Sequence, residues 1–333
     1  MRRAARLLLR IMIHAPVAAT AGCAGVQSVL SPSGVEALQI DPLLWTATWV
    51  GVVVTFIVLA LVAIALYGPA RWRSRLASDW VVIGGGIVFP VTVLTGLFVY
   101  GLVVMQAGMV RSQAADADMV TIVGKRWWWE VTYATADGEE VVSANELRLP
   151  VGRPVRLQLE SDNVIHSFWA PKLAGKLDMI PGRTNELVVE ASEPGVSRAQ
   201  CAEYCGGAHA LMALYVVAMP EDEYDAWLTQ EAEPAREPQT EQQERGRTLF
   251  LENGCGACHR VRGVGARGEI GPDLTHVGGR LSLAAAVLPN DREAFARWIA
   301  DNQQIKPDNL MPPFEQFSQE ELSALAAYLE SLE

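Results

Sequence analysis

The first part of the chain is built from long apolar runs separated by a short charged segment. Residues 43–67 and 81–105 contain no charged side chain, and each run is about 25 residues long. As α-helices, such runs reach roughly 37 Å, which is enough to cross a hydrocarbon core of about 30 Å with some tilt. A buried helix of a soluble protein is seldom this long and this free of charge. The pattern therefore predicts a two-helix transmembrane hairpin within residues 24–110.

The flanking segments give the hairpin an orientation. Residues 68–80, between the two runs, carry three arginines, and positively charged loops stay on the cytoplasmic side. Both ends of the hairpin, and everything after about residue 106, are therefore predicted to lie outside. Residues 1–23 are Arg-rich, then partly apolar, and are predicted to be an export signal peptide. This stretch also resembles a bacterial lipoprotein signal, in which Cys23 would be lipidated, and an unmodified Cys23 is the alternative.

Beyond the hairpin the pattern changes to short runs that favour β-strands. Residues 155–159 alternate between apolar and polar, and Asp137-Gly138 is a turn signal between two such runs. Many short strands with turn signals at about ten-residue spacing predict a β-sandwich or barrel over residues 115–228. Because alternate side chains of a strand face opposite ways, Trp127 and Trp129 are expected to share one face.

The last third of the chain is predicted to be a linker followed by a second soluble domain. Residues 229–243 are polar, charged and interrupted by prolines, as linkers are. Residues 244–333 are expected to form the second domain, and residues 245–251 are predicted to be its first helix. Ser318 and Glu321 have the spacing of a capping box that opens a last helix with one apolar face.

Charge is unevenly distributed along the 333 residues. The first 105 residues hold seven basic and three acidic residues, which leaves 20 basic and 35 acidic residues for the remainder. A soluble part of this acidity argues against nucleic acid as a partner, because phosphates need Lys and Arg. It suits a basic protein partner that is attracted over long range, although solubility alone explains most of the individual charges equally well.

Metal-binding chemistry is concentrated in the pattern C-x3-C-x3-H-x2-M, formed by Cys201, Cys205, His209 and Met212. Thiolate, imidazole and thioether together are a ligand set that copper prefers, and His166 upstream offers one more imidazole. A disulfide would not need a His and a Met at these offsets, and zinc rarely recruits a thioether. We therefore predict a two-copper centre bridged by two sulfurs, rather than a disulfide, a zinc site or chance core packing.

A second motif, Cys255-Gly256-Ala257-Cys258-His259, matches the C-x-x-C-H pattern of covalent haem attachment. Its two thiols would bond to the haem, and His259 would become an axial ligand of the iron. A thioredoxin-type C-x-x-C would need a βαβ setting, which the sequence does not show. Met311 is the only Met after this motif and His276 is the only later His, so both are candidates for the sixth ligand.

These motifs carry a resemblance to a known family. With residues 166–169 (His-Ser-Phe-Trp) and 180–183 (Ile-Pro-Gly-Arg), the copper pattern resembles subunit II of haem–copper cytochrome c oxidases, from about residue 43 to about residue 227. With the haem motif added, the chain resembles oxidases whose subunit II carries a fused cytochrome c. The resemblance implies a multidomain membrane protein with a two-helix transmembrane hairpin, a cupredoxin-like Greek-key β-sandwich and an all-α class I cytochrome c domain.

The resemblance also implies roles for individual residues. The ligands of the binuclear CuA centre would be His166, Cys201, Cys205, His209, Met212 and the backbone carbonyl of Glu203. The side chain of Glu203 would reach a magnesium ion at the border with subunit I. Trp127 would be the exposed aromatic residue at which electrons arrive, and the alternative is that it fills the sandwich core.

For the haem domain, the segment around Met311 is similar to the Met loop of class I cytochromes c, so the resemblance selects Met311 as the axial partner of His259. The turn that contains His276 matches a family turn in which Pro272 orients the axial imidazole through a backbone hydrogen bond. One covalent haem c, bound by Cys255 and Cys258, would then have His/Met ligation, which raises its potential above that of a bis-His haem.

The implied function is that of the electron-accepting subunit of an aa3-type, proton-pumping cytochrome c oxidase. Electrons would pass from cytochrome c or a cytochrome bc1 complex to haem c, then to CuA, and then to the haem–copper site of subunit I, where O2 becomes water. Subunits I and III would be partners in a bacterial inner membrane, with both soluble domains on the periplasmic side.

Two positions depart from the family pattern. Asp79 stands at the start of the second apolar run, where relatives often have a Glu that leads protons into subunit I. Asn163 stands where relatives often have Asp. The alternative function is a membrane-tethered electron carrier that serves a different terminal reductase, while complete ligand sets argue against a structural subunit with degenerate sites.

Overall fold

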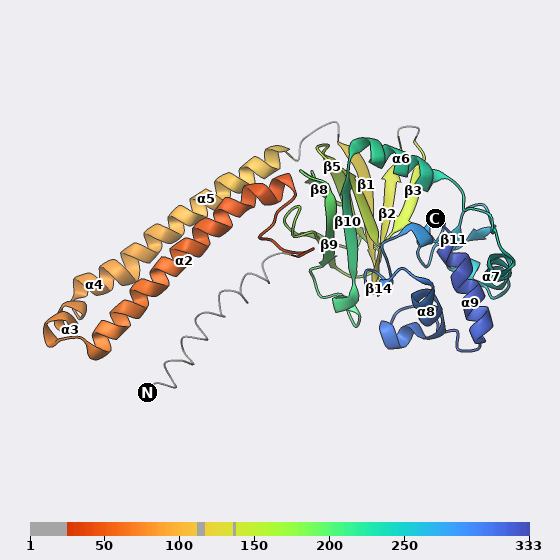
Figure 1. Ribbon diagram of the computed structural model, residues 1–333. Coiled ribbons are helices and arrows are strands. Elements are labelled where there is room, and N and C mark those ends of the chain that lie inside the picture. The colour runs from red at the N-terminus through yellow and green to blue at the C-terminus, as the bar shows by residue number, and fades with distance from the viewer. Residues whose placement is uncertain (1–24, 112–116, 136–137) are drawn as a thin grey trace, which may run out of the picture. The chain divides into compact units, whose positions relative to one another are not determined.

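The structure is a computed structural model that describes residues 25–111, 117–135 and 138–333 (Figure 1). The predicted signal peptide, with Cys23, lies outside the described residues, and so does Asp137 of the predicted turn. The chain divides into two compact units. One consists of residues 36–114, and the other of the residues up to 35 and from 115 onward. Each unit is described by itself.

The smaller unit is a helical hairpin. Its elements are α2 (Val35–Tyr67), α3 (Ala70–Leu76), α4 (Asp79–Ile83), the π-helical turn η1 (Gly84–Val88) and α5 (Phe89–Arg111). Two segments, Val35–Tyr67 and Asp79–Gln106, are long and apolar enough to cross a membrane, and their most apolar stretches have no side chain buried inside the protein. Exposed apolar helices of this length favour a lipid surrounding over water. Helix α2 begins eight residues before the charge-free run at residue 43. The two charged residues in this added part, Glu36 and Asp41, do not prevent a helix.

In the larger unit, the β-domain consists of two five-stranded sheets with the strand orders β3-β2-β1-β5-β8 and β4-β10-β9-β6-β7. The strands are β1 (Asp118–Lys125), β2 (Trp128–Ala134), β3 (Glu140–Ala144), β4 (Glu146–Pro150), β5 (Val155–Ser161), β6 (His166–Trp169), β7 (Leu177–Met179), β8 (Asn185–Val189), β9 (Gly195–Cys201) and β10 (Ala213–Met219). In β1 and β5, every second residue is buried, as the period-two pattern predicts.

The two sheets enclose one hydrophobic core. Trp129 and Tyr133 from the first sheet and Phe168 and Leu214 from the second are all at most 1% exposed and belong to the same cluster. The rings of Trp129 and Phe168 meet edge to face with their centroids 6.0 Å apart. This confirms the predicted sandwich and provides a rigid frame at the ends of β6 and β9, where the candidate copper ligands lie.

The segment before the first helix also belongs to the sandwich unit, although the sequence assigned it to the hairpin. The backbone amides of Ser33 and Gly34 donate to the carbonyl oxygen of Lys172 at 2.8 and 2.9 Å, and Ser192 donates back to Ser33. These are long-range backbone hydrogen bonds, which local sequence patterns do not predict.

One helix that was not predicted from the sequence follows β10, the last strand of the sandwich. Helix α6 (Glu221–Ala232) begins after Pro220, carries three acidic residues in its first turn, and buries Tyr224 and Glu231. Acidic residues in a first turn favour a helix N-terminus, so this signal was available. Trp227 packs on the sandwich through an edge contact with Tyr133 at 5.1 Å. The predicted domain boundary at residue 228 therefore falls inside a helix.

The C-terminal domain is built from α7 (Glu241–Glu252), α8 (Arg292–Ile305) and α9 (Gln319–Glu330). Between them lie three-residue 3-10 turns and two-residue strands: η3 (Cys255–Ala257), β11 (Arg260–Val261), β12 (Ala266–Arg267), η4 (Val277–Gly279), β13 (Ser282–Leu283) and β14 (Leu288–Pro289). Phe250 of α7 meets Tyr328 of α9 with ring centroids 5.9 Å apart. The capping box of Ser318 and Glu321 is confirmed, because both of its hydrogen bonds are present at the start of α9.

The predicted linker is partly fixed against the C-terminal domain. The amide of Ala235 donates to the carbonyl of Arg262 at 3.0 Å, and the Arg262 guanidinium donates to the carbonyl of Glu231. His276 Nε2 donates to the carbonyl of Glu233 at 2.9 Å. These bonds hold the C-terminal domain against α6 and the sandwich within one compact unit.

Candidate metal and haem sites

The candidate copper ligands are brought together at one end of the second sheet. His166 is the first residue of β6 and Cys201 is the last residue of β9, and these two strands pair with Phe168 opposite Cys201. The chain then turns through the 3-10 turn η2 (His209–Leu211) and returns to the sheet at Met212, whose carbonyl accepts from the Cys201 amide at 2.9 Å. Two strand ends and one closed loop thus hold donors that are far apart in the sequence.

The donor atoms form two linked groups around the two sulfurs. The Sγ atoms of Cys201 and Cys205 are 3.7 Å apart. The Cys201 sulfur is 3.7 Å from His166 Nδ1 and 3.2 Å from the carbonyl oxygen of Glu203. The Cys205 sulfur is 3.5 Å from His209 Nδ1 and 3.9 Å from Met212 Sδ.

These distances fit metal ligation by the donors present. Two donors that each lie about 2.3 Å from one metal ion, at a tetrahedral angle, stand roughly 3.7 Å apart. The side chains of His166, Cys201 and Cys205 also place one ligand atom each within 4.8 Å of one another, and all three residues are buried. A soft, largely water-free set of thiolates, imidazoles and a thioether is the chemistry that copper selects.

The competing interpretations fit less well. Both cysteines are free, and a sulfur–sulfur distance of 3.7 Å far exceeds the roughly 2.05 Å of a disulfide bond. A single tetrahedral zinc ion would need both imidazoles at one centre, whereas His166 and His209 contact different sulfurs. The split into one imidazole per sulfur favours two metal ions that share the sulfurs.

Neighbouring groups orient His166. Its Nε2 lies 3.4 Å from the side-chain oxygen of Asn163, which acts as the acceptor, so Nδ1 is left to face the sulfur. The ring is fully buried, and Gly124 of β1 lies directly beside it, because a Cβ atom built on Gly124 would stand 2.8 Å from His166 Cδ2. Asn163, noted in the sequence only as a departure from the family pattern, therefore has a structural role as a hydrogen-bond acceptor.

The two thiols differ in acidity. The hydrogen bond between the two sulfurs lowers the pKa of Cys201; burial opposes this, and bonds to His166 and the backbone lower the pKa further. The same bond raises the pKa of Cys205 well above that of a free thiol, and burial adds to this.

Trp127 differs from what the resemblance implied. Its side chain is only 6% exposed and belongs to the sandwich core cluster, so it is not the exposed aromatic residue that was expected. Trp129 is also buried and Trp128 is half-buried, in agreement with the predicted alternation. Trp127 nevertheless contacts the loop from Cys201 to Met212, called the copper loop below, because its indole Nε1 donates to the carbonyl of Cys205 at 3.0 Å. Glu203 has an exposed side chain, and only its carbonyl oxygen faces the sulfurs.

The haem motif also has a fitting geometry. Cys255 and Cys258 are free, partly buried thiols on the turn that follows α7. His259 Nδ1 donates to the carbonyl of Pro272 at 2.8 Å, which leaves Nε2 available as an iron ligand. This confirms the expected hydrogen bond to Pro272. Burial lowers the pKa of His259, which keeps the imidazole neutral, as an iron ligand must be.

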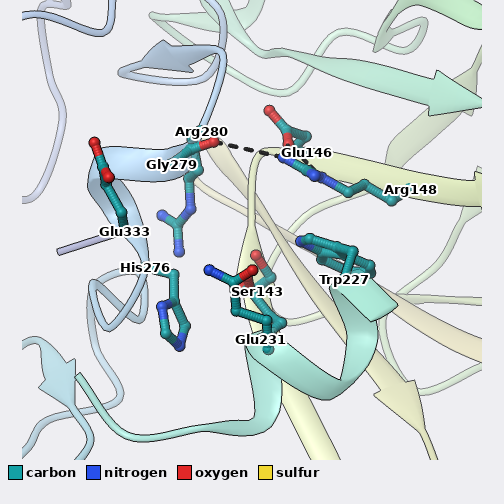
Figure 2. A pocket seen from close by; sticks show the side chains of 10 residues that line it. Ser143, Glu146, Arg148, Trp227, Glu231, His276, Gly279, Arg280 and Glu333 are labelled. Atoms are coloured by element: carbon teal, nitrogen blue, oxygen red, sulfur yellow. Dashed lines mark hydrogen bonds and ion pairs between the residues drawn. The ribbon is translucent and has the colours of Figure 1, made fainter. Parts of the chain in front are cut away.

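The two candidates for the sixth ligand are in different surroundings. Met311 packs against the apolar core of the helical domain. His276 lines a cavity of about 200 Å³ between this domain and the sandwich, together with the charged residues Glu146, Glu231 and Arg280 (Figure 2). Its Nε2 is already bonded to the carbonyl of Glu233. The apolar position of Met311 suits a thioether ligand better than the cavity position of His276 suits an imidazole ligand.

Comparisons with known proteins agree with these two sites. The profile of the family described as cytochrome c oxidase subunit II, periplasmic domain, matches residues 136–219, and that of cytochrome c matches residues 243–333. Cytochrome c oxidase subunit 2 of Alkalihalophilus pseudofirmus is 33% identical over 334 aligned positions, which cover 93% of each chain. The protein of the same name from Bacillus sp. PS3 is 26% identical and covers 78% of this chain and 74% of its own.

Among solved structures, the periplasmic domain of subunit II of cytochrome oxidase from Bradyrhizobium japonicum is 30% identical. The match covers 34% of this chain and 92% of that one, with a TM-score of 0.33.

Proposed function

Because this chain belongs to the cytochrome c oxidase subunit II family and carries a cytochrome c domain, we propose that it is the electron-accepting subunit of an aa3-type, proton-translocating oxidase. A subunit II works in association with subunit I of a haem–copper oxidase, and its two soluble domains imply copper and haem. The proposal adds the electron path, which runs from an external donor through haem c and CuA to subunit I, where O2 is reduced to water.

Two sets of ligands, one for copper and one for haem, support the proposed function most strongly. On the copper side, three side chains (His166, His209 and Met212) and one carbonyl group lie 3.2–3.9 Å from two free sulfurs, which are 3.7 Å apart. On the haem side, two thiols and an oriented imidazole follow one helix, and Met311 packs against the apolar core of the domain. When bound, the two groups supply one-electron transfer without bond making or breaking.

The protein's own contribution is to hold these ligands still. The strand pair β6–β9 fixes His166 relative to Cys201, and Asn163 sets the orientation of the imidazole. A donor set held on a packed sandwich changes little between redox states, which favours fast electron transfer. We further propose that the copper site holds two copper ions, that one covalent haem c is attached to Cys255 and Cys258, and that the exposed Glu203 carboxylate reaches Mg²⁺ at the subunit I border.

The location and partners follow from the same reasoning. Two apolar helices make the chain a membrane protein, and the three arginines of α3 favour a cytoplasmic position for the loop between them. We propose the bacterial inner membrane, with the sandwich and haem domains on the outer side. Subunit III, and cytochrome c or a cytochrome bc1 complex as donor, complete the proposed assembly.

Replacing one copper ligand tests the function. In the purified oxidase, Cys201→Ser or His209→Ala is expected to abolish donor-driven oxygen uptake, because the electron path loses its copper centre. The spectrum of haem c in the same sample serves as the folding control and is expected to stay unchanged. An oxygen uptake rate equal to that of the unchanged oxidase would contradict the copper assignment.

A further inference from the structure

A buried lysine joins the haem domain to the copper domain. Lys306 directly follows α8 and is only 3% exposed. Its ammonium group donates to the carbonyl oxygen of Trp127 at 2.6 Å and to that of Ala284 at 3.0 Å. Burial lowers the pKa of Lys306 to about 7. Burying this amine costs free energy unless its N–H groups are hydrogen-bonded, and the two carbonyl oxygens accept those bonds.

On the haem side, Lys306 is tied to the segment of the proposed iron ligand. Asn309 Nδ2 donates to the carbonyl of Lys306 at 2.7 Å, and Asn309 Oδ1 accepts from the amide of Met311 at 2.9 Å. Gln303 Nε2 adds a bond to the Met311 carbonyl at 3.1 Å. The position of Met311 is therefore set by the same turn that contains Lys306.

On the copper side, the residue that receives Lys306 is tied to a proposed copper ligand. The backbone of Trp127 accepts from Lys306, and its indole donates to the carbonyl of Cys205 at 3.0 Å. One series of hydrogen bonds thus runs from Met311 through Asn309, Lys306 and Trp127 to Cys205.

Two further contacts hold the domains together beside Lys306. The amide of Ala213, which follows Met212, donates to the carbonyl of Ala285 at 3.3 Å. Asp308 lies directly over Gly207 of the copper loop, where an added Cβ atom would come within 2.3 Å of its carboxylate. The loop between the copper cysteines and Met212 is therefore in contact with two segments of the haem domain.

We propose that Lys306 is a positioning residue that fixes the Met311 segment on the backbone of the copper domain, so that the haem domain stays docked beside the copper loop. This inference rests on the proposed function and adds how its two sites are held together. An external donor would then dock on the haem domain rather than on the copper domain.

The test uses Lys306→Met in the complete oxidase complex, because methionine fills a similar volume but donates no hydrogen bond. The matched control is Lys176→Met, which removes an exposed ammonium group that reaches the carbonyl of Ala202 in the same loop at 3.5 Å. The readouts are hydrogen exchange of the Ala213 amide, kcat and KM with reduced cytochrome c, the haem c spectrum and the copper EPR signal.

A buried hydrogen bond from a charged donor changes the equilibrium between docked and undocked domains roughly tenfold. Loss of the two hydrogen bonds of Lys306 is therefore expected to have an effect of at least that size. For Lys306→Met, we expect exchange of the Ala213 amide to accelerate about tenfold and kcat to fall about tenfold, while KM and both spectra stay unchanged. Lys176→Met is expected to change none of them. If Lys306→Met loses either spectrum, Lys306→Gln replaces it, because glutamine keeps a neutral donor but loses the charge; we then expect a smaller change of amide exchange and kcat in the same direction.

Unchanged amide exchange and kcat in a variant with intact spectra would overturn the role of Lys306 and leave the proposed function standing. Absence of a two-copper EPR signal from the unchanged oxidase would instead overturn the proposed function.

Discussion

The contact between Gly124 and His166 leads to a sharp prediction about the copper site. Gly124 lies in β1, in the sheet opposite His166, and the imidazole ring occupies the space where a side chain would project. A Cβ atom at this position would stand 2.8 Å from Cδ2, 3.0 Å from Cγ and 3.2 Å from Cβ of His166. Gly124→Ala therefore pushes directly on a proposed copper ligand without changing any ligand.

The size of the effect follows from the packing. Carbon atoms in ordinary contact are about 3.5–4.0 Å apart, so the ring or the strand must retreat by roughly 0.7 Å. Metal–ligand distances tolerate only about 0.2 Å of error, and the fully buried ring also packs against Trp129 with centroids 6.3 Å apart. We expect copper affinity to fall by about 10–100-fold, as when a group that orients a ligand is lost, with about 1–3 kcal/mol of overpacking strain.

The assay is copper titration of the metal-depleted oxidase, followed by EPR of the copper centre, with the haem c spectrum as an internal standard for folding. Gly279→Ala is the matched control, because a Cβ atom there meets only Glu333 Cα at an ordinary 3.8 Å. Copper affinity and EPR parameters equal to those of the unchanged protein would refute the reasoning, since they would show that His166 does not need its present position.

Three further predictions concern the haem domain. Gly271→Ala would place a Cβ atom 2.5 Å from Cε1 of His259, so we expect a shifted haem c spectrum and a changed midpoint potential; an unchanged potential would argue against His259 as ligand. Met311→Ala is expected to remove the sulfur ligand and shift the haem spectrum, and an unchanged spectrum would transfer the ligand role to His276. Ser318→Ala removes a helix cap, which should cost about 1 kcal/mol and lower the melting temperature of a domain of this size by about 4–8 °C, measured by thermal unfolding at the haem band. Bonds from Ser318 lower the pKa of Glu321 below its usual 4.5, so the stabilisation should be present above that pH and be lost as the pH falls below it.

Local pattern was sufficient to locate the candidate sites and most elements. Period-two alternation located the strands of the sandwich, and the capping box located the start of α9. The spacing of Cys201, Cys205, His209 and Met212 indicated copper, and the structure brings these donors to within 3.9 Å of a sulfur. Such signals succeed because they depend on residues that are close in the sequence, where chain geometry leaves few alternatives.

The two failures have different causes, because a local signal was overlooked in one case and long-range contacts decided the other. Helix α6 has a weak amphipathic pattern but a clear acidic first turn, and it was read as the end of a domain. The sequence left Trp127 either exposed or in the sandwich core, and the structure places it in the core cluster with its indole bonded to the carbonyl of Cys205. The contact between the Lys306 ammonium group and the Trp127 carbonyl joins residues 179 positions apart, and local pattern does not contain that information.

By itself, the sequence determined which donors are present, in what spacing, and on what kind of element, because ligand type and periodicity are properties of neighbouring residues. Only the tertiary structure decided that His166 turns Nδ1 toward Cys201 under the control of Asn163, and that Gly124 leaves room for the ring. It also decided that Lys306 bridges the two domains. These features depend on strand register and domain packing, which are set by contacts summed over the whole fold.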